Sequence, residues 1–158
     1  YEVASAYADA RDALRDPRRA PEGVRPASGD AARRLLSRDR LVVCTAGHEA
    51  NVGPWVRLGL RGYDVVEWQA EPVRDARTGR THWRPSIDTL RTLVNERTLL
   101  VLMPQVSNIL GEVWDVAAAA DVAHAAGARM MVDGVAYAPH RAPDVAALGC
   151  DWYVYSTY

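Results

Sequence analysis

The sequence predicts an α/β fold of three layers, in which helices cover both faces of a mainly parallel sheet. Segments with helical periodicity alternate along the chain with short apolar runs that have the composition of strands. Runs such as RLVVCTA (40–46) and RTLLVLMPQ (97–105) are apolar over most of their length, which is typical of strands buried on both faces. The chain has 158 residues, 49% of them hydrophobic, which is enough for one domain with its own core.

The N-terminal part is predicted to contain two helices joined by a loop. Residues 1–15 place apolar side chains at a spacing of three to four, which indicates a helix with one apolar face. That face consists of Val3, Ala6, Tyr7, Ala10 and Leu14. Residues 16–30 carry three prolines and two glycines, which favours a loop insertion. Residues 31–38 are expected to form a second, short helix.

The next segment is predicted to run from strand to helix to strand. The strand over 40–46 is followed by a helix that we expect to begin near Asn51–Pro54, because proline is tolerated in a first turn. Gly62 follows as a stop signal. The run YDVVEWQ (63–69) then predicts a second strand.

A hairpin and a capped helix are predicted between the second and third strands. Residues 72–85 contain a turn at Thr78–Gly79 and indicate a small exposed hairpin. Ser86 has the position of an N-cap for a helix over 86–95.

The C-terminal part continues the alternation of strands and helices. After the strand over 97–105 we expect a helix over 115–127, a strand over 128–134, a short helix over 142–149 and a last strand over 151–156. No internal repeat and no low-complexity segment interrupts this order.

Composition and charge exclude several classes of protein. The net charge of −1 favours neither a nucleic-acid nor a membrane partner, and no apolar run has the length of a membrane span. The two cysteines, Cys44 and Cys150, are expected to be free thiols in a reducing compartment, hence cytoplasmic, although a disulfide or a catalytic thiol stays open. All nineteen basic residues are arginine, so chemistry that needs a lysine cannot be carried by these residues alone.

Polar residues follow four of the predicted strands, where ligands bind in parallel sheets. They are Gly47, His48, Glu49 and Asn51 after the first strand; Gln105, Ser107, Asn108 and Gly111 after the third; Asp133, Gly134, Tyr137 and His140 after the fourth; and Ser156, Thr157 and Tyr158 after the last. They are expected to converge on one cleft.

Each candidate also has a purely structural interpretation. His48 could cap the following helix, Asn108 could be an ordinary turn residue, and Ser156 could be a surface hydroxyl. Asp133 is the strongest candidate, because an acid that ends an apolar strand is buried and a buried carboxylate needs a partner. No cation lies beside Asp133 in the sequence, so a cationic ligand would suit it.

Other site motifs are missing from the sequence. It contains no G-x-G-x-x-G, no Walker-type G-x-x-x-x-G-K, no C-x-x-C and no G-x-S-x-G, and its histidines lack metal-ligand spacing. An aspartyl nucleophile at Asp133 would call for a second acid two residues later, where Val135 stands. A nucleotide, metal or hydrolase site is therefore not supported.

Three ordered stretches resemble one known family. GHEANVGPW, VSNILGEVWDV and ARMMVDGVAYAPHRAPDVAALGCDWYVYSTY are similar to the class V aminotransferase and cysteine desulfurase family of pyridoxal-5′-phosphate (PLP) enzymes. The resemblance covers residue 39 to the end and implies the aspartate-aminotransferase fold. Residues 1–15 would match the helix after the family's phosphate-binding loop. The 158 residues would then be an incomplete PLP-binding large domain that lacks an N-terminal segment and the small C-terminal domain.

The resemblance also implies roles for individual residues. His48 would stack on the pyridine ring, Asn108 would lie near the phenolic oxygen, Asp133 would pair with the protonated ring nitrogen, and Ser156 would contact the phosphate. Tyr158 stands where a histidine commonly precedes the Schiff-base lysine, so that lysine is expected immediately after Tyr158.

The desulfurase pattern is incomplete at two positions. Ala136 replaces a glutamine that contacts the phenolic oxygen, and Tyr158 replaces the histidine. Neither Cys44 nor Cys150 matches the family's active cysteine. The implied activity is thus carbon–sulfur cleavage or a class V aminotransferase reaction on a small-molecule substrate, an amino acid. The parent protein is expected to be a homodimer, and the 158 residues are expected to be inactive alone. A non-catalytic binding or scaffold relative, or an enzyme using Asp133 for metal or phosphoryl chemistry, are the alternatives.

Overall fold

The computed structural model describes residues 2–20 and 28–157. Its main sheet contains β1 (Arg40–Cys44), β2 (Asp64–Trp68), β5 (Thr98–Pro104), β6 (Arg129–Asp133) and β7 (Trp152–Val154). The strands lie in the order β2-β1-β5-β6-β7, and every neighbouring pair is parallel. The expected parallel sheet is confirmed.

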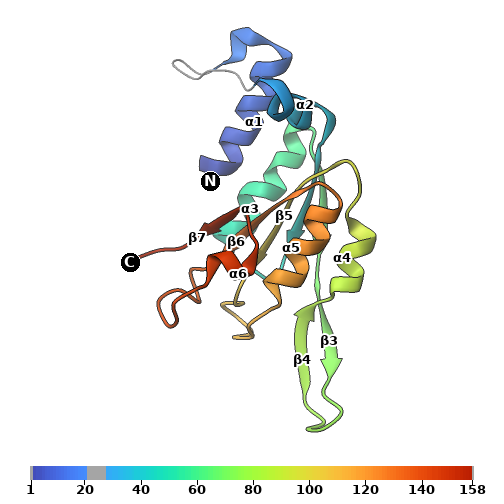
Figure 1. Ribbon diagram of the computed structural model, residues 1–158, viewed down its shortest axis with the longest axis vertical. Helices are drawn as coiled ribbons and strands as arrows, with labels where there is room; N and C mark the ends of the chain where they lie inside the picture. Colours follow the sequence, from blue (N-terminus) through green and yellow to red (C-terminus); the bar gives the residue numbers. More distant parts are fainter. Residues whose placement is uncertain (1, 21–27, 158) are drawn as a thin grey trace.

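Helices cover both faces of the sheet, as expected for three layers (Figure 1). They are α1 (Glu2–Arg15), α2 (Gly29–Ser37), α3 (Glu49–Val56), α4 (Ile87–Leu93), α5 (Val116–Ala125) and α6 (Val145–Leu148), with short 3-10 turns η1 (Pro17–Arg19) and η2 (Arg57–Arg61). Helices α4 and α5 pack on one face, and α1 and α3 pack on the other. No helix in the described ranges is both long and apolar enough to cross a bilayer.

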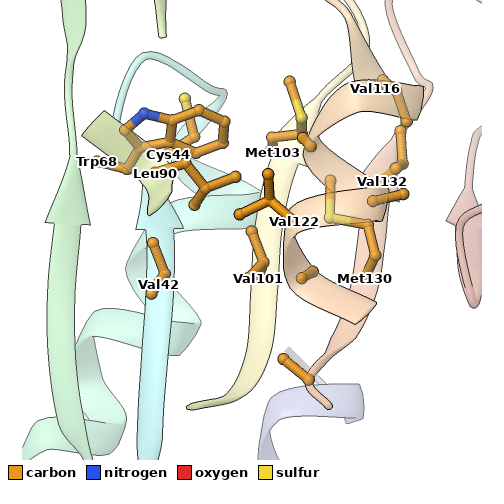
Figure 2. Packing of buried hydrophobic residues seen from close by; sticks show 14 of the residues in the cluster. Val42, Cys44, Trp68, Leu90, Val101, Met103, Val116, Val122, Met130 and Val132 are labelled. Carbon is orange, nitrogen blue, oxygen red and sulfur yellow. The ribbon is translucent and has the colours of Figure 1, made fainter. Parts of the chain in front are cut away.

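The core is divided by the alternation of side chains along each strand. In β1, Val42 and Cys44 point toward α4 and α5, whereas Leu41 and Val43 point toward α1 and α3. Figure 2 shows the first of these clusters, with Trp68, Leu90 and Met103 packed beside them. Strand β5 is buried at all seven positions. Each fully buried aliphatic side chain there stabilises the fold by about 1.5–3 kcal/mol.

A two-stranded antiparallel hairpin, β3 (Ala70–Arg74) and β4 (Thr81–Pro85), projects beyond the sheet (Figure 1). This confirms the predicted hairpin, with Gly79 in its turn at a φ of 70°. The carboxylate of Glu112 accepts a hydrogen bond from the Trp83 amide (3.2 Å) and pairs with His82 (3.0 Å). The Trp114 indole N–H donates to the Trp83 carbonyl (3.3 Å). The segment after β5 thereby fastens the hairpin to the body.

The face that α1 buries differs from the predicted one. The buried positions include Ala4, Ala8 and Arg11, whereas Ala6 is exposed and the Val3 side chain lies outside the described residues. Small alanines let α1 approach the sheet closely. The Arg11 guanidinium is buried because it lies 4.3 Å from the ring centre of Tyr63, a cation–π contact.

Helix α3 begins earlier than predicted, at Glu49, so Pro54 lies inside the helix rather than in its first turn. The cap explains this difference. His48 Nδ1 accepts a hydrogen bond from the Ala50 amide (3.1 Å), which starts the helix ahead of the proline. The structural interpretation of His48 as a cap is confirmed, as is Ser86 as the cap of α4.

Several other boundaries also differ from the predictions, most clearly those of α2, β1 and β7. Helix α2 begins at Gly29, within the predicted loop of 16–30, and η1 forms a turn in the same stretch; residues 21–27 lie outside the described residues. Strand β1 ends at Cys44 instead of residue 46. Strand β7 ends at Val154, so the predicted strand residues Tyr155 and Ser156 lie beyond the sheet.

Candidate functional site

Four of the five predicted site residues lie at or just beyond the carboxyl ends of neighbouring strands, at one edge of the sheet. Asp133 is the last residue of β6, while His48, Asn108 and Ser156 follow β1, β5 and β7 within a few residues. Because these four strands are adjacent and parallel, their carboxyl ends share one edge. Tyr158 lies outside the described residues. The structure thus supports a common location for the four.

Asp133 is a buried carboxylate, with 8% of its surface exposed. Its Oδ1 accepts a hydrogen bond from the Val135 amide (3.0 Å), and its main-chain carbonyl accepts one from Gln105 (2.9 Å). Among the residues that the structure describes, no arginine or histidine forms an ion pair with it. A buried carboxylate that receives one amide hydrogen bond and has no described ion-pair partner suits a small protonated ligand.

His48 is exposed, and its role as a cap fixes its ring. Since Nδ1 accepts the Ala50 amide hydrogen, the neutral ring carries its proton on Nε2. The neutral ring therefore keeps a fixed tautomer while the residue stays exposed.

Asn108 is an exposed residue of a tight turn, so its structural interpretation as a turn residue is confirmed. The Gly111 amide donates to the Ser107 carbonyl (2.8 Å), and Gly111 has a φ of 70°. Ser107 itself is fully buried, and its hydroxyl donates to the Ala46 carbonyl (2.8 Å). The loop of Asn108 is therefore connected directly to the loop that leads to His48.

The partly buried Tyr153 and the buried Gln105 form a hydrogen-bonded pair beside Asp133. The phenol of Tyr153 donates to Gln105 Oε1 (2.6 Å), and Gln105 is almost fully buried. Burial raises the pKa of Tyr153, with smaller contributions from Tyr137, Cys150 and Asp133. The phenol thus stays protonated and acts as a donor. The sequence marked Gln105 only as a polar residue after a strand, and it assigned no role to Tyr153.

Ser156 lines a pocket of about 610 Å³ together with Pro139, Val145 and Tyr155. His48, Asn108 and Asp133 do not line this pocket, nor two further pockets of about 430 and 370 Å³ next to the hairpin, within the part of the chain that the structure describes. Ser156 is therefore placed at the shared edge without being joined to the other three in one described cavity.

Both cysteines are free thiols, as expected. Burial raises the pKa of Cys44 to about 12, and burial also raises the pKa of the half-buried Cys150. Neither environment favours the thiolate that nucleophilic chemistry needs. In residues 2–20 and 28–157, no group of three His, Cys, Asp or Glu side chains is arranged to hold a metal ion.

Comparison with known proteins identifies the family. The family model of aminotransferase class-V matches residues 22–158, so the chain belongs to the class V aminotransferase family. It is 37% identical over 137 residues to the aminotransferase-like protein FGM3 of Gibberella zeae, covering 81% of this chain and 31% of that protein. It is 39% identical over 119 residues to a cysteine desulfurase of Dickeya dadantii, covering 75% of this chain and 27% of the relative.

A solved structure supports the same assignment. The cysteine desulfurase CsdA of Escherichia coli matches with a TM-score of 0.66 and 32% identity, over 78% of this chain and 30% of that chain. The chain therefore spans about a third or less of the length of these relatives.

Proposed function

We propose that this chain is the cofactor-binding part of a PLP-dependent enzyme that acts on an amino acid, by carbon–sulfur cleavage or by a class V aminotransferase reaction. The observation that carries the proposal is Asp133, a buried carboxylate at the carboxyl end of a parallel strand without a cation among its described neighbours. Bound PLP would act as an electron sink for density from the substrate's α-carbon. Family membership supports the same reading.

Asp133 would hold a proton on the pyridine nitrogen of the cofactor. An adjacent negative charge favours the protonated form of a base, and the low-dielectric surroundings strengthen that effect. The Val135 amide keeps one carboxylate oxygen occupied, which fixes the direction of the other. Asp133 would therefore serve as an oriented anion and not as a nucleophile.

The other site residues would bind and orient the ring. The His48 imidazole would stack on it, the Asn108 amide would face the phenolic oxygen, and Ser156 would contact the phosphate, with Tyr158 nearby. The cap on α3 supports the role of His48, because a ring with a fixed tautomer makes a rigid platform. The location of all three at the carboxyl edge is what supports their assignment.

The proposal places further requirements on the whole protein. None of the 158 residues is lysine, so the amine that binds the cofactor covalently would come from outside them. We further propose a homodimer in the cytoplasm, where the free thiols Cys44 and Cys150 would stay reduced.

The proposal is tested with the protein as its gene encodes it. Purified protein is mixed with PLP, its visible absorbance is recorded, and sulfide release from L-cysteine and keto-acid formation from other amino acids are followed. Asp133→Asn keeps the shape of the side chain but loses its charge, and we expect turnover to fall about a hundredfold. Asp121→Asn, an exposed acid on α5, is the control and should leave turnover unchanged. A protein that binds no PLP would instead be a scaffold relative.

A further inference from the structure

Ser107 connects two segments that are far apart in the sequence. Its hydroxyl donates to the carbonyl of Ala46 (2.8 Å), two residues before His48, while its own main chain leads directly into Asn108. Ser107 is fully buried, so no water competes for this hydrogen bond. One side chain therefore touches both loops that carry the ring-facing residues of the proposed site.

The hydroxyl of Ser107 has no unused hydrogen-bonding capacity. A serine hydroxyl offers one donor and two acceptor positions. The donor is used by Ala46, and the oxygen accepts from the amides of Leu110 (3.2 Å) and Ile109 (3.4 Å). The same oxygen thus closes the turn around Asn108 and fixes its distance from Ala46.

The Ala46 segment is also held from its other side. The Thr45 amide donates a hydrogen bond to the Trp68 carbonyl (3.1 Å). A β-carbon on Gly47 would lie 3.4 Å from the ring of Pro104, so the loop runs close to the end of β5. A loop confined in this way transmits the position of Ser107 to His48.

We infer that Ser107 is a positioning residue, which sets the separation between the His48 imidazole and the Asn108 amide without touching the cofactor. This inference rests on the proposed PLP function. Removing the hydroxyl frees the Ala46 carbonyl and both turn amides at once, so the two loops should loosen together. The cofactor would then meet a site whose two sides move independently.

The first experiment needs no cofactor. Hydrogen–deuterium exchange is measured for residues 46–50 and 108–111 in the protein as its gene encodes it, in wild type, Ser107→Ala and Ser107→Thr. We expect Ser107→Ala to raise exchange in both segments, and Ser107→Thr, which keeps a hydroxyl, to stay near wild type. Gly111→Ala, which strains only the turn at a φ of 70°, should raise exchange in 108–111 alone. Faster exchange in one segment only, or in neither, for Ser107→Ala would overturn the inference.

The second experiment adds PLP. Ser107→Ala should weaken PLP binding about tenfold and shift the visible absorption maximum of the bound cofactor, whereas Ser107→Thr should restore both. Ser37→Ala on exposed α2 is the matched control and should change neither. Loosened loops with unchanged affinity and spectrum would contradict the positioning role. Absence of PLP binding in wild type would instead contradict the proposed function, while the exchange data would still report on the coupling of the loops.

A second variant keeps the inference testable if Ser107→Ala misfolds. If Ser107→Ala does not fold, Ser107→Cys keeps a side chain of similar size with a much weaker donor. It should show the same paired increase in exchange and a smaller loss of affinity. Wild-type exchange and affinity in a folded Ser107→Cys protein would overturn the inference.

Discussion

The phenol ring of Tyr153 occupies the space where a β-carbon on Gly134 would lie. An ideal β-carbon at residue 134 would be 2.1 Å from Tyr153 Cζ, far inside contact distance. The hydrogen bond from Tyr153 to Gln105 (2.6 Å) holds the ring in this position. The residue directly after the buried Asp133 therefore has to be glycine for reasons of space.

We expect Gly134→Ala to lower the free energy of unfolding by about 1–3 kcal/mol, because the added methyl group overpacks against an anchored ring. Chemical denaturation checks this value. Gly59→Ala, whose β-carbon would meet only Val65 at 3.9 Å, is the control. The double variant Gly134→Ala/Tyr153→Ala should lose less than the two single changes together. Equal denaturation midpoints for Gly134→Ala and wild type would contradict the packing described above.

The pH dependence of stability should depend in part on Asp39. Two hydrogen bonds from Arg97 (3.0 and 2.9 Å) hold the pKa of Asp39 below its ordinary value of 3.8, although burial opposes them. A carboxyl with a lowered pKa in the folded state contributes stability above its unfolded pKa. It loses that contribution as the pH falls through the folded pKa.

Asp39→Asn should therefore be less stable than wild type at pH 7, and the difference should shrink as the pH falls below about 4. The pair is partly exposed, so we expect a difference of about 1 kcal/mol or less. Urea denaturation of both proteins between pH 7 and pH 3 measures it. A difference that stays constant over this range would show that the charge of Asp39 contributes nothing.

Glu112 should control the local stability of the hairpin. Its carboxylate accepts a hydrogen bond from the Trp83 amide. Trp83 lies opposite Pro72 in the hairpin, and proline has no amide hydrogen to donate to Trp83 in return. We expect Glu112→Ala to speed hydrogen exchange of the Trp83 amide about tenfold, the loss of one hydrogen bond to a charged group. Glu112→Gln keeps an acceptor oxygen and should have a smaller effect. Unchanged exchange in Glu112→Ala would mean that the other contacts of the hairpin, including the bond from Trp114, hold it without Glu112.

The two thiols should differ in reactivity in the folded protein. With a pKa of about 12, Cys44 at pH 8 has only about one thiolate in ten thousand, and it is buried in β1. We expect an alkylating reagent to label Cys150 first and Cys44 only after denaturant is added. Mass spectrometry of the labelled peptides separates the two. Cys150→Ser should leave the native protein unlabelled, and rapid labelling of Cys44 in that variant would contradict its burial.

Most of the fold could be predicted because its signals are local. The apolar runs of β1, β5 and β6, the cap at Ser86 and the turn at Gly79 each act within a few residues, and each was located correctly. The predicted buried face of α1 is correct at Tyr7, which packs against the core, but it leaves out Ala4, Ala8 and Arg11. Arg11 is buried against Tyr63, which lies far along the chain. Periodicity counts arginine as polar and cannot register such a partner.

The candidate site, like the fold, has a part that could be predicted from the sequence and a part that could not. The rule that ligands bind at the carboxyl ends of parallel strands gave a longer set of polar residues that includes His48, Asn108, Asp133 and Ser156. The family resemblance selected these four from that set, and their roles toward PLP stay predictions. The supporting contacts could not be found from sequence, because they join distant segments. Ser107 contacts Ala46, and Tyr153 contacts both Gln105 and Gly134. A small polar residue three positions after the buried strand β5 is the one signal that pointed toward Ser107.

The strand order also has a consequence for how the protein is made. Val42 in β1 pairs with Val66 in β2 and with Val101 in β5. A ribosome releases β1 and β2 first, and the hairpin and α4 must follow before β5 can join. During that interval one edge of β1 and its apolar side chains have no partner, and non-local pairing of this kind is slow and prone to aggregation. The pairing of β1 with β5 at the centre of the finished sheet is therefore a step at which the nascent chain is exposed to aggregation.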